Sequence, residues 1–331
     1  MHAAPSEPKA LRRALLLALV SVALIAVAGC GSDEESDGAG APAPSAAAFP
    51  EPDGQSVEEI FAAAAPSEDI VVSPSGQVFN EGTNRFGFGV FTAGREQIND
   101  ADVAIYAGRP GKPAKGPFPA RIEDMTTDPA FTAITTATDP DAAKTVYAAD
   151  LELDALGRWD LVALVDDGET VHSTRIPSID VGAFDEVPVA GEKAPVIETP
   201  TADDVSNLDE IDTRDPHSTQ HEENFADVVG EKPVVLTFAT PLLCQSRVCG
   251  PVVDVAEQVK ADHAGEEITF IHQEIFEDND INKGLREQVR AYGLPTEPWV
   301  FVIGADGEIS TAIEGAFSVA ELDAAVDKVA H

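Results

Sequence analysis

Two cysteines, Cys244 and Cys249, are the residues whose type and spacing best suggest chemistry in this sequence. They stand between a β-branched run at 233–240 and an apolar pattern at 252–259, whose spacing of three to four residues predicts a helix. A thiol at a strand-to-helix junction lies near unpaired N–H groups and the positive helix end, which stabilise a thiolate. Because Cys244 is closer to this junction, we expect it to attack disulfides and Cys249 to be the resolving thiol.

The four residues between the cysteines limit how the two thiols can meet. In a continuous α-helix, positions five apart are separated by about 140° around the axis and by about 7.5 Å along it. That arrangement puts the two Cα atoms outside the range of a disulfide. We therefore expect either that Cys244 lies in a loop before the helix, or that the first helical turn unwinds when the bond forms.

The elements expected around the pair follow the order of an α/β domain. Beyond the first strand and its helix, they are a helix at 225–229, strands at 268–275, 299–303 and 308–313, and helices at 281–292 and 319–329. With the cysteine pair after the first core strand and Pro298 directly before a later strand, residues 223–331 resemble the thioredoxin fold.

The resemblance implies a thiol–disulfide oxidoreductase acting on protein or small-molecule disulfides and thiols, with no cofactor and no metal. It implies that Pro298 is cis and packs against the catalytic cysteines. It also implies that the neighbours of this proline, Glu297 and Trp299, bind an incoming peptide or thiol. The sequence departs from the family in its four-residue spacing, in Leu243 where a Trp is usual, and in Thr237 near the place of a buried acid. The family's redox potential therefore does not carry over.

Three other interpretations of the cysteine pair remain open. One peroxiredoxin class, the bacterioferritin-comigratory type, has the same gap, but its Thr lies three residues before the first Cys, whereas Thr240 lies four before Cys244. Sco-type copper chaperones combine a thioredoxin fold with two Cys and a His, for which His272 is the local candidate. A structural disulfide in a binding or scaffold lipoprotein is the third interpretation.

The N-terminal residues predict export. A basic leader and an apolar run at 14–28 end in Val27-Ala28-Gly29-Cys30. This ending resembles a bacterial lipobox, which implies that residues 1–29 are a lipoprotein signal peptide and that Cys30 is lipidated. The chain would then be anchored to the extracytoplasmic face of the bacterial membrane, and Cys244 and Cys249 would remain as an isolated pair in an oxidising compartment. A retained transmembrane helix is the alternative.

Charge and composition predict two acidic connecting segments and exclude some classes of partner. The excess of 59 acidic over 21 basic residues gives a net charge of −38, which argues against nucleic acid and anionic headgroups as partners. Residues 30–56 are acidic and rich in Ala, Pro and Gly, so we expect a disordered tether with lipidated Cys30 at its start. Residues 184–222 form a second acidic connector, in which we interpret His217 and His221 as ordinary linker histidines.

Residues 68–183 carry a β pattern without a useful helical segment. Short β-prone runs separated by turn residues lie at 69–72, 84–91, 103–106, 145–149, 159–165 and 169–176. They resemble the immunoglobulin-like domains of bacterial envelope proteins of the YtkA/FixH type, and they bring no active-site motif. The expected fold class is therefore two-domain, an all-β immunoglobulin-like sandwich followed by an α/β thioredoxin-like fold.

Overall fold

The computed structural model describes residues 40–244 and 246–330. The predicted signal peptide and Cys30 lie outside these residues. In the described part of the chain, no helix is long and apolar enough to cross a membrane. All described residues fall within one compact unit, Ser36–His331. The expected pair of modules joined by a linker is therefore not confirmed, and we call residues 40–183 the first region and residues 184–330 the second region.

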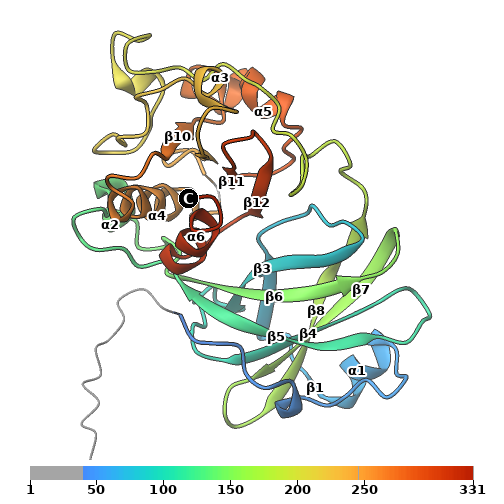
Figure 1. The fold of residues 1–331 in the computed structure, drawn as a ribbon. Coiled ribbons are helices and arrows are strands. Elements are labelled where there is room, and N and C mark those ends of the chain that lie inside the picture. The colour runs from blue at the N-terminus through green and yellow to red at the C-terminus, as the bar shows by residue number, and fades with distance from the viewer. Residues whose placement is uncertain (1–39, 245, 331) are drawn as a thin grey trace, which may run out of the picture. The chain divides into compact units, whose positions relative to one another are not determined.

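The first region contains eight strands joined in the order β1-β8-β7-β4-β5-β6-β3-β2 (Figure 1). They are β1 (Ala65–Pro66), β2 (Ile70–Pro74), β3 (Gly82–Thr92), β4 (Asp102–Gly108), β5 (Lys115–Asp124), β6 (Thr145–Leu153), β7 (Gly157–Asp166) and β8 (Val171–Val181). Six of them match the predicted runs. Strands β1 and β5 were not predicted, and β5 contains Pro117 and Pro119, which normally argue against a strand.

Strand β5 connects two halves of this sheet. Its first part pairs with β4, through Ile105 and Phe118, and its second part pairs with β6, through Ala120 and Ala149. One hydrophobic cluster includes buried side chains from both halves, among them Phe88 and Trp159. The β prediction is therefore correct for most strands, but β1 pairs with β8 in parallel and the immunoglobulin-like assignment is not confirmed.

The segment before the first strand is ordered where it is described. Residues 40–56 run along the sheet, where the Pro50 carbonyl accepts a hydrogen bond of 2.6 Å from the Tyr106 hydroxyl. Phe49 is 5% exposed and packs in a cluster that also contains Ile60 of helix α1 (Val57–Ala63). The predicted disordered tether is wrong for residues 40–56, because a buried aromatic ring and main-chain hydrogen bonds fix them to the sheet.

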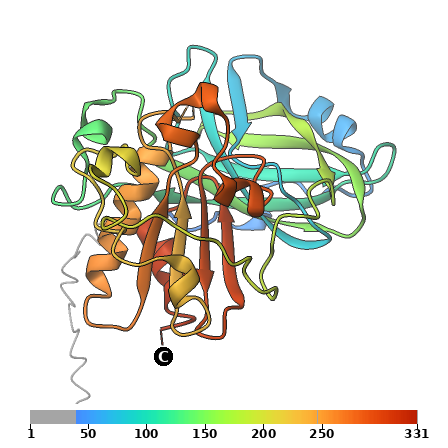
Figure 2. The same ribbon diagram turned by 90° about the horizontal axis from the view of Figure 1, so that it is seen from above.

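The second region has a four-stranded sheet in the order β10-β9-β11-β12, seen from above in Figure 2. Its elements are α3 (Phe225–Val228), β9 (Val234–Phe238), α4 (Cys249–Asp262), β10 (Thr269–Gln273), α5 (Glu287–Ala291), β11 (Trp299–Ile303), β12 (Ile309–Glu314) and α6 (Val319–Val326). This is the predicted element order. Helix α5 is shorter than expected, because residues 281–283 form a separate 3-10 turn that ends at Gly284, where φ is +88°.

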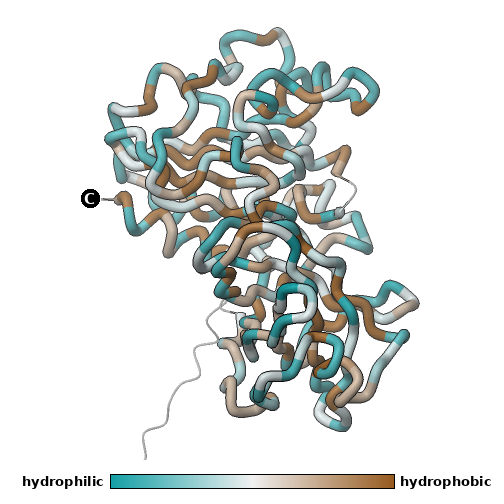
Figure 3. Tube along the Cα trace, turned by 90° about the vertical axis from the view of Figure 1, so that its right-hand side faces the viewer, coloured by the Kyte–Doolittle hydropathy of each residue, from teal (hydrophilic) through white to brown (hydrophobic). Residues whose placement is uncertain are grey.

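The strands of this sheet are apolar because both of their faces are covered. Helices α4 and α6 pack on one face, and α3 and α5 pack on the other. Every residue of β9, β10 and β11 is buried. In Figure 3, hydrophobic residues gather toward the inside of the chain trace, and hydrophilic residues are frequent in the outer loops.

Residues 184–222 do not behave as the predicted free linker. Val187, Ala194 and Ile197 are buried in the core that also contains β9 and β11. The Gly191 N–H donates to the Ile309 carbonyl at 2.9 Å. The segment therefore adds apolar and main-chain contacts to the second region, despite its acidic composition.

Glu321 of α6 joins the two regions. Its carboxylate contacts Arg85 of β3 at 2.6 Å and Arg121 of β5 at 2.8 Å, and its side chain is 12% exposed. Burial raises the pKa of Glu321, but the two guanidinium groups outweigh burial and leave the pKa below its ordinary value. The carboxylate is therefore a buried charge whose stability depends on its partners.

We expect Glu321→Gln to lower the free energy of unfolding by about 3–5 kcal/mol, because two partly buried arginines lose their counter-charge. The pKa of Glu321 is lower in the folded state than in the unfolded state. The contribution of Glu321 to the free energy of unfolding is therefore fully present above the unfolded-state pKa, and it is lost as pH falls through the folded-state pKa. Urea unfolding at pH 7 and at acidic pH would measure both effects. Glu58→Gln, in an exposed pair with Arg175, is the matched control and should leave the free energy of unfolding nearly unchanged, because solvent screens that pair. Equal losses in the two variants would contradict the prediction.

Candidate redox site

The cysteine pair lies at the start of helix α4. Cys249 is the first helical residue, and Cys244 lies in the preceding turn, where its N–H donates to the Thr240 carbonyl at 3.1 Å. Of the two expected arrangements, the one that places Cys244 before the helix is therefore confirmed. Cys249 is fully buried, and Cys244 is 9% exposed.

The surroundings of the two thiols push their pKa values apart. Hydrogen bonds from the Cys249 thiol, from the Ser246 hydroxyl and from the backbone N–H groups of Cys249 and Val248 lower the pKa of Cys244 to about 5, although burial opposes them. The Ser246 oxygen lies 3.1 Å from the Cys244 sulfur. Burial and the neighbouring Cys244 raise the pKa of Cys249 well above its ordinary value. The surroundings therefore make Cys244 the more acidic of the two thiols.

The proline implied by the resemblance is cis. The Glu297–Pro298 peptide bond is cis and directly precedes β11. Burial and the charge of Cys244 raise the pKa of Glu297, so this carboxyl group lies within electrostatic reach of the cysteine pair. The structure thus brings Glu297 to the site, whereas contact of the Pro298 ring with the thiols remains a prediction.

Trp299 is placed differently from the expectation. Its indole is 4% exposed, donates to the Thr296 hydroxyl at 3.1 Å and stacks on Phe301. This side chain fills the core of the second region. Its predicted contact with a substrate therefore has no support in the geometry.

One cavity is lined by Cys244, and a second is lined by residues 246–248 that follow it in the chain. One of about 450 Å³ is lined by Cys244 and Arg247 and, from the first region, by Thr136 and Asp139. The other, of about 830 Å³, is lined on one side by Ser246 and Glu297 and on the other by β2, β3 and residues 140–146. The cavity at Cys244 therefore has walls from both regions.

The first region reaches the site through the β5–β6 connection, residues 125–144, which includes α2 (Ile134–Thr138). Arg247 forms a 2.6 Å ion pair with Asp139, and the Ala133 N–H donates to Asp254 of α4. Figure 1 shows α2 beside α4. Sequence reasoning missed this connection, because it has no periodic pattern and no motif.

Neither a protein-family model nor a curated protein matches the sequence. A solved thioredoxin-family thiol:disulfide interchange protein from Chlorobium tepidum TLS is 20% identical, with a TM-score of 0.30, over 44% of this chain and 100% of its own. The ZirS C-terminal domain is 14% identical, with a TM-score of 0.16, over 44% of this chain and 88% of its own. These scores are too low to establish a family. Only the geometry of the site can therefore support a function for this chain.

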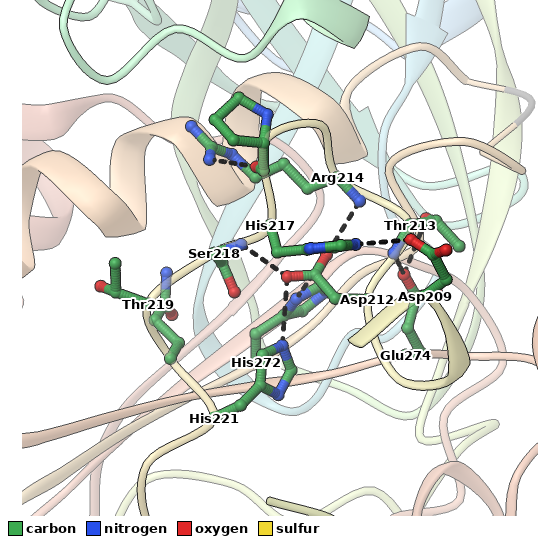
Figure 4. A network of polar contacts seen from close by, with 12 residues as sticks. Asp209, Asp212, Thr213, Arg214, His217, Ser218, Thr219, His221, His272 and Glu274 are labelled. Carbon is green, nitrogen blue, oxygen red and sulfur yellow. Dashed lines mark hydrogen bonds and ion pairs between the residues drawn. The ribbon is translucent and has the colours of Figure 1, made fainter. Parts of the chain in front are cut away.

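A second group of chemically capable residues lies in the same region but outside both cavities. Asp212, His221 and His272 are buried and converge in one polar network (Figure 4). The interpretation of His221 as an ordinary linker histidine is wrong, because it is 4% exposed and its Nε2 contacts Asp212 at 3.2 Å. His217, in contrast, pairs with Asp209 at the surface. No local sequence signal connects Asp212 with His272, since only the fold brings them together.

Proposed function

We propose that this chain is a thiol–disulfide oxidoreductase in which Cys244 attacks a substrate disulfide and Cys249 resolves the intermediate. The observation that carries this proposal is the asymmetry of the two thiols. Cys244 lines a cavity and has a pKa of about 5, whereas Cys249 is fully buried with a raised pKa. A purely structural disulfide needs neither a lowered pKa nor a cavity beside one sulfur.

The exchange balances without any cofactor. The Cys244 thiolate attacks one sulfur of the substrate disulfide, the substrate S–S bond breaks, and the leaving thiolate takes up a proton. Cys249 then loses its proton and attacks the Cys244 sulfur of the mixed disulfide, which releases the second substrate thiol. The substrate gains two electrons, and the Cys244–Cys249 disulfide forms. The reverse sequence transfers that disulfide to a dithiol.

Titration of the full chain in defined thiol/disulfide buffers, with free thiols counted by alkylation and mass spectrometry, tests the proposal. A reversible two-electron transition between about −120 and −270 mV supports catalytic exchange. A pair that stays oxidised below about −300 mV contradicts it and makes the bond structural.

Ser246→Ala is expected to raise the pKa of Cys244 by about one unit, because the thiolate loses one charge-assisted hydrogen bond. In the wild-type chain, the rate of alkylation should rise with pH through about 5 and then level off, since only the thiolate reacts. The alkylation profile at Cys244 measures both values. Ser206→Ala, which removes a hydroxyl bonded to Glu210, is the matched control and should leave the profile unchanged. A profile centred near pH 9 in the wild-type chain would contradict the assignment of the attacking thiol.

We further propose that the chain is exported and held at the extracytoplasmic face of the membrane by lipid on Cys30. The support is the lipobox-like sequence Val27-Ala28-Gly29-Cys30. Lipidation would reserve Cys244 and Cys249 for exchange with each other. Labelled palmitate should enter the wild-type chain in bacterial cells and should not enter Cys30→Ala. Equal labelling of both chains would overturn this proposal.

A further inference from the structure

His272 has one ring nitrogen that is buried and unsatisfied. The residue lies in β10 and is 1% exposed. Its Nε2 donates to the Ala239 carbonyl at 3.0 Å, so Nε2 carries a proton. Its Nδ1 has no hydrogen-bond partner among the described residues and lies 3.6 Å from Asp212 Oδ1. A lone pair facing a carboxylate is repulsive, so either a second proton or a metal ion has to lie at Nδ1.

The hydrogen bond to Ala239 gives His272 the arrangement of a metal ligand. Histidines that bind metals commonly donate their other ring N–H to a carbonyl or a carboxylate, which fixes the tautomer and the ring orientation. Asp212 is fixed in a similar way, because its two oxygens accept the N–H groups of Arg214 at 2.8 Å and Ser218 at 2.6 Å. Both side chains are thus oriented before any ion arrives.

His221 completes the group. Its Nε2 lies 3.2 Å from Asp212 Oδ2, and the rings of His221 and His272 are 5.4 Å apart. Ligand atoms from the three residues all lie within 4.8 Å of one another. Tetrahedral zinc with bonds of about 2.0–2.1 Å separates its ligand atoms by about 3.3–3.4 Å. The distance from His221 Nε2 to Asp212 Oδ2 is 3.2 Å and that from His272 Nδ1 to Asp212 Oδ1 is 3.6 Å, so each imidazole lies near this separation from one oxygen of the carboxylate.

We propose that Asp212, His221 and His272 bind a divalent first-row transition metal ion, which we expect to be Zn²⁺. Two imidazoles and one carboxylate suit zinc, whereas Ca²⁺ and Mg²⁺ require more oxygen ligands. The three side chains are at most 3% exposed, and neither cavity beside the cysteines is lined by them. The ion would tie residues 212–221 to β10, and a water molecule would complete the tetrahedral coordination that three side chains leave open. This inference does not depend on the proposed thiol chemistry.

The first test is metal binding by the full chain after removal of metal with a chelator. Titration with Zn²⁺ in competition with a chromophoric chelator should show one ion bound per chain, and His221→Gln should weaken binding at least about tenfold. His263→Gln is the matched control, because His263 lies in another His–acid group in which both ring nitrogens are already paired. Its affinity should equal that of the wild-type chain. Absence of zinc binding in the wild-type chain, or loss of binding only in His263→Gln, overturns the proposal.

A second test separates this site from metal binding by the cysteines and does not alter the three proposed ligands. In Cys244→Ser/Cys249→Ser, zinc should bind with unchanged affinity. The Co²⁺-substituted double variant should show d–d absorption without a sulfur-to-metal charge-transfer band. Loss of zinc in this double variant would assign the metal to the thiols and overturn the proposal. A second proton on His272, instead of an ion, would show as no metal bound in either chain.

Discussion

Cys244→Ser is expected to abolish disulfide exchange, whereas Cys249→Ser is expected to accumulate a mixed disulfide with the substrate. The serine hydroxyl is not ionised at neutral pH and cannot replace a thiolate whose pKa is about 5. Without Cys249, the first attack still occurs, but no neighbouring thiol releases the bound substrate. Turnover of a fluorogenic peptide disulfide with a chemical reductant, together with intact-mass measurement, checks both results.

Two outcomes would separate the roles of the cysteines further. If Cys249→Ser accumulated no adduct while Cys244→Ser did, the assignment of attacker and resolver would be reversed. Normal turnover in Cys244→Ser would exclude exchange at this pair. Trp299→Phe serves as a control. The Trp299 ring is buried and packs on Phe301, so replacing it with another aromatic ring should leave the rate of mixed-disulfide formation unchanged.

Arg214→Met is expected to lower the free energy of unfolding by about 3–5 kcal/mol. Arg214 is 5% exposed and contacts Asp254 of α4 at 2.8 Å. It also donates to the carbonyls of Phe131 and Pro216, so one guanidinium joins α4, the β5–β6 connection and the segment before α3. Its removal leaves the carboxylate of Asp254 buried without a counter-charge. Urea unfolding monitored by fluorescence measures the loss.

A double variant separates the ion pair from the other contacts of Arg214. Replacing a buried pair by apolar residues of similar size is often neutral, so Arg214→Met/Asp254→Leu should be more stable than Arg214→Met alone. Lys283→Met, which breaks an exposed pair with Asp278, should leave the free energy of unfolding nearly unchanged. If Arg214→Met cost no more than Lys283→Met, the proposed bridging role of Arg214 would be wrong.

The parts of the structure that depend on neighbouring residues could be predicted from the sequence. The β-branched run before Cys244 became β9, and the spaced valines after Cys249 became α4. The cis bond before Pro298 followed from the family resemblance. Each of these features is determined by side chains a few residues apart, which a sequence pattern records directly.

Features that depend on distant contacts were not predicted. Strand β5 forms despite its prolines because it pairs with β4 and β6 on either side. His221 was interpreted as a linker residue because nothing near it in sequence indicates burial beside His272. The acidic composition of residues 30–56 predicts disorder, yet residues 40–56 are held against the sheet by the buried side chain of Phe49. In each case, a partner far along the chain outweighs the local preference.

The walls of the two cavities beside Cys244 carry a consequence for selectivity. The thiols and the cis proline belong to residues 223–331, but part of each wall comes from the first region, through Thr136 and Asp139 in one cavity and through β2 and β3 in the other. If the proposed exchange takes place at Cys244, its cavity walls come partly from a region that carries neither thiol, so mutations there would alter access to the thiols without altering the thiols themselves.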